Sequence, residues 1–151
     1  MNVLITAAST AQAYKLEKVL SETNNVVFAD SAELPEILLK SRKFLKIAAA
    51  DSASYAHQLL SCCLSFDIQL VFPLRRQEIA ALGESRQLFD EYGIKVMLPA
   101  LDTIHKYFGS AKTGELIIMG LNSDSSAQSP DRGAFLFNEG ANPEFQILTV
   151  D

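Results

Sequence analysis

The sequence predicts an α/β fold, in which a parallel sheet between two layers of helices is followed by a small antiparallel β extension. Two observations predict the parallel sheet. Short apolar segments alternate with helical segments over residues 1–108, and turn or proline residues close most of the apolar segments. A third observation predicts the extension, because five of the seven glycines lie from Gly109 to Gly140, among strand-like runs and polar loops.

The first elements follow from hydrophobic spacing. Residues 3–5 (Val-Leu-Ile) form an apolar, β-branched run that is typical of a buried strand. Ser9 or Thr10 can cap a helix that extends to about Glu22, because its apolar residues recur on one face. The run Val-Val-Phe-Ala at 26–29 predicts the second strand.

The middle of the chain continues the alternation. A short helix is predicted over 31–40 and a third strand over 44–49. Asp51 is a good residue to cap the next helix. Residues 68–72 predict a fourth strand, which a proline ends, and 77–92 predict one long helix.

The end of the parallel region is also marked. Gly93 can end the long helix in the left-handed conformation. A fifth strand is predicted over 94–98 and a short helix over 101–108. Right-handed crossovers between successive parallel strands then give a Rossmann-like, three-layer sheet.

The region after residue 108 predicts a different architecture. Strands are predicted over 116–119, 134–137 and 145–150, with a polar, serine-rich loop over 122–132. We therefore divide the chain into a Rossmann-like domain, residues 1–108, and a β-rich extension, residues 109–151, which is too short for a second enzymatic domain.

Composition excludes several classes of function. The net charge of −5 argues against nucleic acid as a partner, because phosphate neutralisation needs a concentrated basic surface. No apolar run approaches the ~18 residues of a membrane span. Cys62 and Cys63 are neighbours, too close for an ordinary disulfide, so a reduced, cytoplasmic setting is expected. The histidines and cysteines lack the spacing of a zinc site, and no metal is expected.

The loop after the first strand argues against a dinucleotide cofactor. The first glycine of the chain is Gly83, so this loop, residues 6–11 (Thr-Ala-Ala-Ser-Thr-Ala), lacks the glycines that let a backbone approach a pyrophosphate. We therefore expect no cofactor. Ser9 and Thr10 remain candidates for substrate binding, because free N–H groups at a helix start attract anions. Close packing of the strand against the helix is the structural alternative.

The other candidates for substrate binding follow strands two and four. Ligands of an open parallel sheet bind at the carboxyl ends of its strands. Asp30 ends the second strand, and Arg75, Arg76 and Glu78 follow the fourth. The two guanidinium groups can clamp a carboxylate or a phosphate. The structural alternatives are a capping aspartate and a solvated helix start. No Ser/His/Asp or Cys/His set falls on neighbouring strand ends, so no catalytic residue is predicted.

Residues 1–108 resemble a known family through a set of motifs that occur in order. The resemblance rests on Met1–Thr6, Ala29–Ser31, Asp51, Tyr55, Leu60, Asp67–Ile68, Phe72–Pro73, Glu78–Leu82, Phe89, Gly93–Val96 and His105–Tyr107. This segment looks like the N-terminal, pre-ATP-grasp domain of ATP-grasp ligases, and is similar to proteins related to the large subunit of carbamoyl-phosphate synthase.

The resemblance implies that the domain helps to bind an acceptor substrate, while ATP, Mg²⁺ and the catalytic residues belong to a following ATP-grasp domain. Two motifs depart from the family. Ser9-Thr10 stands where glycine and arginine are usual, and His105-Lys106 replaces an Asp-Lys pair. Only 43 residues follow Phe108, too few for an ATP-grasp domain.

Three hypotheses follow. The first is a stand-alone, catalytically silent pre-ATP-grasp domain that binds a small molecule or a separate ATP-grasp chain. The second is an enzyme, either the substrate-binding half of an ATP-dependent carboxylate-amine ligase acting in trans, or a degenerate NAD(P)-binding protein. The third is an interaction role, in which the strands of 109–151 pair with those of a second copy to give a homodimer.

Overall fold

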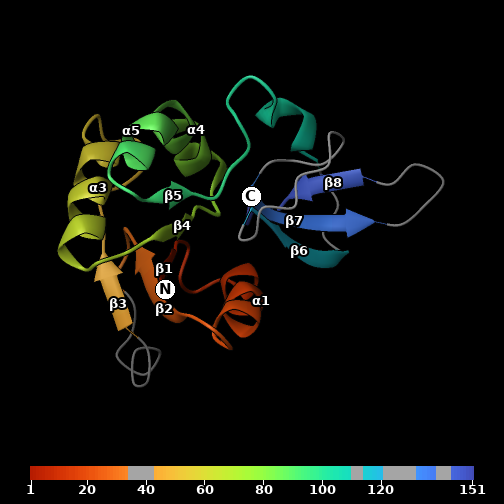
Figure 1. The fold of residues 1–151 in the computed structure, drawn as a ribbon, viewed down its shortest axis with the longest axis horizontal. Helices are drawn as coiled ribbons and strands as arrows, with labels where there is room; N and C mark the ends of the chain where they lie inside the picture. The colour runs from red at the N-terminus through yellow and green to blue at the C-terminus, as the bar shows by residue number, and fades with distance from the viewer. Residues whose placement is uncertain (34–42, 110–113, 121–131, 139–143) are drawn as a thin grey trace. The chain divides into compact units, whose positions relative to one another are not determined.

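The computed structural model describes residues 1–33, 43–109, 114–120, 132–138 and 144–151. The chain divides into two compact units. The first comprises Met1–Val96 together with Thr149–Asp151, and the second comprises Met97–Leu148. A five-stranded sheet lies in the first unit and a three-stranded sheet in the second (Figure 1).

The first unit is built on an all-parallel sheet of order β3-β2-β1-β4-β5. Its strands are β1 (Asn2–Ile5), β2 (Asn25–Asp30), β3 (Lys43–Lys46), β4 (Leu70–Phe72) and β5 (Lys95–Val96). In the central register, Leu4 lies opposite Val27 on one side and Val71 on the other. The predicted α/β class and the parallel sheet are confirmed, and the strand order reverses between β1 and β4.

Helices cover both faces of this sheet. They are α1 (Ala11–Leu20), α3 (Tyr55–Ser65), α4 (Arg76–Glu84) and α5 (Arg86–Glu91). Figure 1 shows α1 on one face and α3 with α4 on the other. The fully buried residues Leu16 of α1 and Leu59 of α3 face this sheet core, as the helical spacing predicts.

The predicted caps are partly confirmed. Thr10 caps α1, because its Oγ1 accepts a hydrogen bond from the Ala13 N–H at 3.3 Å. Gly93 has φ +76, and the Ile94 N–H donates to the Phe89 carbonyl at 3.0 Å, which is the left-handed helix end expected there. Asp51 does not cap α3, which begins at Tyr55. It lies in a turn that the bond from the Ser52 N–H to the Ala49 carbonyl closes.

The prediction of a single long helix over 77–92 is wrong. Two helices, α4 and α5, meet at Ser85, whose N–H donates to the carbonyl of Leu82 three residues back. Gly83 and Ser85 explain the break, because glycine has a high conformational cost inside a helix and serine favours helix ends. The helix predicted over 31–40 falls mostly outside the described residues.

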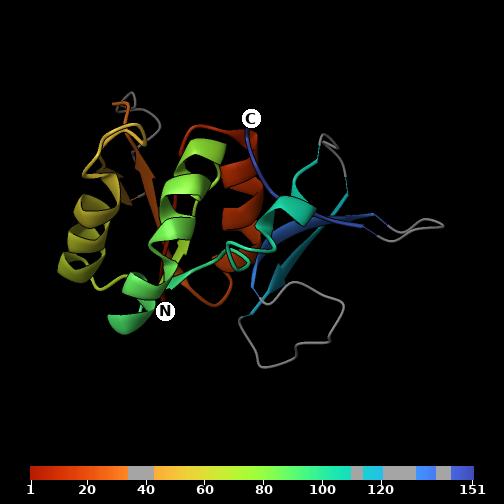
Figure 2. The same ribbon diagram turned by 90° about the horizontal axis from the view of Figure 1, so that it is seen from above.

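The second unit contains an antiparallel sheet of order β6-β7-β8, which confirms the predicted extension (Figure 2). Its strands are β6 (Glu115–Met119), β7 (Gly133–Asn138) and β8 (Glu144–Ile147). Phe135 is its buried centre, with the ring of Tyr107 edge-on at 5.6 Å. The helix predicted over 101–108 is reduced to a 3-10 turn, Ile104–Tyr107, and the predicted serine-rich loop lies almost entirely outside the described residues.

Within the described ranges, no helix is both long enough and apolar enough to cross a membrane.

Candidate functional site

The carboxyl ends of β1, β2 and β4 carry polar residues that the sheet brings together. Thr6 follows β1, Asp30 ends β2, and Arg75 lies between β4 and α4. These are neighbouring strands, and the strand order reverses between β1 and β4. In open α/β sheets this reversal opens the crevice in which ligands bind. The expected position of a site and the observed polar residues therefore coincide.

Thr6 joins the ends of β1 and β4. Its N–H donates to the Phe72 carbonyl at 3.2 Å, and its Oγ1 accepts from the Leu74 N–H at 2.9 Å. Thr6 is fully buried, so both bonds are shielded from water. The Thr6 side chain also lowers the pKa of the Glu78 carboxyl. Thr6 thus fixes the short connection from which α4 starts.

Asp30 and Arg75 form a partly buried ion pair across this edge. Arg75 Nη2 lies 3.1 Å from Asp30 Oδ2 and 3.3 Å from Oδ1. Asp30 is 3% exposed, whereas the Arg75 side chain is 37% exposed. Arg75 Nε also lies 3.6 Å from Oε1 of Glu78. One guanidinium group therefore compensates two carboxylates that have left water.

Glu78 occupies the first turn of α4 and is 4% exposed. Burial raises the pKa of its carboxyl to about 7, and the Asp30 and Asp151 carboxylates act in the same direction. The hydrogen bond from Thr6 and the charge of Arg75 oppose this rise in pKa. Within the described part of the chain, Glu78 Oε2 has no hydrogen-bond partner. Near neutrality this buried carboxyl is therefore divided between its two protonation states.

Tyr55 adds a second buried oxygen without a partner. It begins α3, is 1% exposed, and its Oη has no hydrogen bond to any residue that the structure describes. Burial raises the pKa of the phenol well above its usual value, and the charge of Glu78 adds to this. Tyr55 is therefore a neutral phenol that can both donate and accept a hydrogen bond.

We call Thr6, Asp30, Tyr55, Arg75 and Glu78 the strand-end cluster. It contains three of the residues predicted for substrate binding, Asp30, Arg75 and Glu78. Sequence reasoning did not propose Thr6 or Tyr55 as site residues. The available signals were the position of Thr6 directly after a buried strand and the helical spacing that places Tyr55 on the buried face with Leu59.

The other three predicted residues, Ser9, Thr10 and Arg76, are not members of this cluster. Thr10 is occupied as the cap of α1, and its Oγ1 also donates to the Ala7 carbonyl at 2.7 Å. Ser9 is exposed in the turn before that helix. The guanidinium of Arg76 does not join that of Arg75, because Arg76 Nε donates to the Asp151 carbonyl at 3.0 Å. The two arginines thus bind different partners rather than forming one clamp.

Metal-binding clusters and cysteines with a lowered thiol pKa are not found among the described residues. In the described ranges, no three His, Cys, Asp or Glu residues lie close enough to hold a metal ion. Both cysteines are free, and burial raises the pKa of the Cys63 thiol to about 12, so it stays protonated and unreactive.

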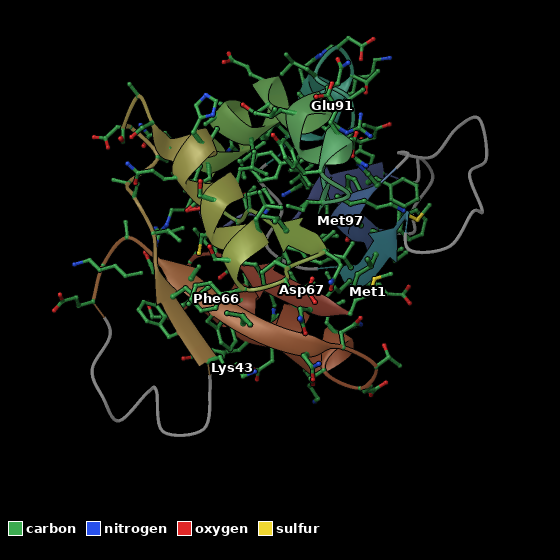
Figure 3. The ribbon with its side chains drawn as sticks, turned by 60° about the vertical axis from the view of Figure 1, so that its left-hand side comes forward. Met1, Lys43, Phe66, Asp67, Glu91 and Met97 are labelled. Carbon is green, nitrogen blue, oxygen red and sulfur yellow. The ribbon has the colours of Figure 1, made fainter. Side chains whose placement is uncertain are left out.

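A hollow of about 280 Å³ lies elsewhere in the same unit, where strands of the sheet begin. Lys43 and Phe66, both labelled in Figure 3, lie on its wall. Its remaining lining residues are Asn2, Val27, Phe44 and Leu45. The hollow has the volume for a small ligand, but two buried oxygens without a partner among the described residues, Tyr55 Oη and Glu78 Oε2, belong to the strand-end cluster. We therefore take the cluster as the candidate site.

Comparison with known proteins is consistent with this fold. Residues 3–97 match the family described as "PylC-like, N-terminal domain", which is the pre-ATP-grasp domain of ATP-grasp ligases, and no ATP-grasp domain family is detected. No curated protein matches the sequence. Among solved structures, "MoeE5 in complex with UDP-glucose and NAD" is similar, with a TM-score of 0.42 and 18% identity. The similarity covers 76% of this chain but only 40% of that one, and has no bearing on what this chain binds.

Proposed function

The chain belongs to the PylC-like N-terminal domain family, and we propose that it acts by binding a substrate rather than as an enzyme on its own. The proposed ligand is a small molecule that bears both a carboxylate and an ammonium group, and free amino acids are the simplest members of that class. The ATP-dependent step then belongs to an ATP-grasp domain that lies outside these 151 residues.

One observation carries the proposal. Tyr55 Oη and Glu78 Oε2 are two buried oxygens without a partner among the residues that the structure describes, and both belong to the cluster at the strand-order reversal, where the charge of Glu78 acts on Tyr55. A buried polar atom without a partner costs about 1–3 kcal/mol, so such atoms call for a functional explanation. A ligand that donates to both oxygens recovers this free energy when it binds.

The charges of the cluster support the ligand class. Asp30 and Glu78 can accept from an ammonium group, while Arg75 pairs with both of them and remains partly exposed. An arginine binds a carboxylate through a fork of donors. A molecule with both groups can therefore enter without leaving a buried charge unpaired.

The test is an NMR titration of the full chain with the free amino acids, one at a time. We expect at least one of them to shift the backbone signals of Thr6, a member of the cluster, and of Ala32, whose N–H donates to Asp30 Oδ1 at 3.4 Å. Glu78→Gln should abolish the shifts. Glu84→Gln, the same change at an exposed position of the same helix, should leave them intact. If no amino acid shifts these signals, the proposed ligand class is wrong.

Two further titrations address the enzymatic alternatives. Incubation with Mg²⁺ and ATP should give no turnover by the chain alone, and release of ADP would contradict the assignment as a binding domain. NADH should leave the Thr6 signal unchanged, because the loop after β1 has no glycine. A shift caused by NADH would favour the degenerate dinucleotide-binding protein instead.

We also propose that two copies of the chain pair through β6. Its residues Leu116–Met119 are all apolar and all partly exposed, and in the described sheet β6 hydrogen-bonds to β7 alone. Such an edge strand is a template for pairing with another chain. Ile117→Lys should then convert a dimer into a monomer in light scattering. A monomeric wild-type chain would overturn this second proposal without affecting the first.

A further inference from the structure

The start of α4 is capped by a residue from the far end of the sequence. Arg75 precedes the helix and forms no side-chain cap. The Arg76 N–H instead donates to Asp151 Oδ1 at 2.9 Å, and Arg76 Nε donates to the Asp151 carbonyl at 3.0 Å. A helix start carries free N–H groups and a partial positive charge, so it favours an oxyanion. Asp151 supplies that oxyanion from within the chain.

The neighbouring residues hold Asp151 in place. The Val150 N–H donates to the Leu74 carbonyl at 2.8 Å, and Thr149 Oγ1 donates to the Asp151 carbonyl at 3.1 Å. Residues 149–151 thus lie along the junction between β4 and α4 and are hydrogen-bonded to it. Figure 2 shows the chain end, marked C, beside the start of α4. We call residues 149–151 the docked segment.

The charge of the docked segment acts on Glu78, a member of the strand-end cluster. The Asp151 carboxylate contributes to the raised pKa of Glu78, so the two carboxyl groups lie close enough to repel each other. Glu78 is 4% exposed and its Oε2 has no partner in the described residues, so a buried acceptor lies beside the junction that Asp151 covers. Geometry places the Glu78 carboxyl there as well, because its Oε1 lies 3.6 Å from Nε of Arg75, the residue directly before α4.

The positive groups at the junction agree with an oxyanion site. Arg75 compensates the buried Asp30 carboxylate, and Arg76, the first residue of α4, donates through its Nε to Asp151. A carboxylate or phosphate that replaces Asp151 meets this second guanidinium group.

We infer that the start of α4 is an oxyanion-binding site which the docked segment occupies, and that the carboxylate or phosphate of a ligand binds there by displacing Asp151. This inference rests on the proposed function, because it places one anionic group of the ligand beside the strand-end cluster. The docked segment is then a built-in competitor. A ligand binds with its intrinsic affinity multiplied by the fraction of molecules in which the segment has left.

The test compares the full chain with its Asp151→Asn variant, using succinate and inorganic phosphate as probes. If the segment is docked in nine molecules of ten, the variant should bind a probe up to about tenfold more tightly. The signal to follow is the backbone N–H of Arg76, which loses its charged acceptor in the variant. Asp102→Asn, the same change at an exposed position, is the matched control and should leave the affinity unchanged.

A second readout follows displacement directly. In the wild-type chain, a saturating probe should speed hydrogen exchange at the Val150 N–H, because its bond to Leu74 opens when the segment leaves. The probe that acts at the lower concentration distinguishes a carboxylate ligand from a phosphate ligand. Equal affinities in the wild type and Asp151→Asn, with unchanged exchange at Val150, would overturn the inference.

The outcomes separate this inference from the proposed function. If Glu78→Gln abolishes amino-acid binding while Asp151→Asn leaves probe affinity unchanged, the ligand site is supported. The inference that the docked segment competes with a ligand is then wrong. If Asp151→Asn tightens probe binding while no amino acid binds the wild type or the variant, the oxyanion site stands and the proposed ligand class is wrong.

Discussion

Asp30 and Arg75 are separated by 45 positions in the sequence, yet their side chains meet at 3.1 Å where β2 ends and α4 starts. The pair is asymmetric, because the carboxylate is buried and the guanidinium is partly exposed. A buried carboxylate is tolerated only when a partner compensates the loss of water. Arg75 supplies that compensation, and it can also turn toward a ligand because it keeps contact with solvent.

Removing this partner should destabilise the fold. In Arg75→Ala, Asp30 remains buried without a cation, and we expect a loss of about 2 kcal/mol, below the usual figure for a fully buried pair because solvent reaches Arg75. Urea unfolding measures the loss. Arg75→Lys keeps the charge and should lose less. A value for Arg75→Ala within about 0.5 kcal/mol of the wild type would show that Asp30 does not depend on Arg75.

The raised pKa of Glu78 predicts how stability depends on pH. The folded state holds this proton up to about pH 7, whereas the unfolded chain releases it near the ordinary glutamate pKa of 4.5. The contribution of Glu78 to stability is therefore complete below pH 4.5 and is lost as the pH rises through about 7. The groups that face Glu78 are Thr6, Asp30, Tyr55, Arg75 and Asp151.

Comparison with Glu78→Gln isolates this effect. The free energy of unfolding of the wild type, relative to the variant, should fall by about 2 kcal/mol between about pH 5 and about pH 8, since each pKa unit corresponds to about 1.4 kcal/mol. The variant cancels contributions from the other ionisable groups. A wild type that gains stability relative to the variant over this range would mean that the pKa of Glu78 is lowered, not raised.

Tyr55→Phe should separate stability from binding. The variant removes a buried hydroxyl that has no partner in the described residues, so stability should stay the same or rise by about 1 kcal/mol. Amino-acid affinity should fall, because the ligand loses a hydrogen-bond partner. Thermal unfolding and the NMR titration measure the two quantities. A strongly destabilised variant would instead reveal that Tyr55 Oη has a structural partner.

Thr6→Val tests the junction between β1 and β4. Valine has nearly the same shape, but it leaves the buried Leu74 N–H without its acceptor, and we expect a loss of about 2 kcal/mol. Thr6→Ser keeps the hydroxyl and should lose less than Thr6→Val. The reverse order in chemical unfolding would indicate that the methyl group of Thr6, not its hydroxyl, holds the junction.

Sequence reasoning predicts those helices and strands that a short run of neighbouring residues identifies by itself. The run at 3–5 identifies a buried strand by itself, and Gly93 identifies a helix end because few other residues adopt φ +76. The break between α4 and α5 at Ser85 is not visible in the sequence, because the helical spacing of apolar residues continues from one helix into the other. Asp51 was assigned as a cap on residue type alone, whereas the cap position depends on how the preceding turn closes.

The candidate site was predictable to the extent that topology determines it. Parallel strands bring their carboxyl ends to one edge, which was enough to group Asp30 with Arg75 and Glu78. The role of Tyr55 depends on how α3 packs, and no local pattern reports that. The contact between Arg76 and Asp151 spans 75 positions and follows from the return of the chain to the first unit.

The most direct test of the strand-end cluster follows the side-chain Nε–H signal of Arg75 during the amino-acid titration. If the cluster is the binding site, this signal shifts together with the backbone signal of Ala32, because the ligand enters between Arg75 and the carboxylates of Asp30 and Glu78. If the Arg75 signal stays in place while those of Lys43 and Phe44 shift, the ligand occupies the hollow beside β3. That result would contradict the assignment of the site.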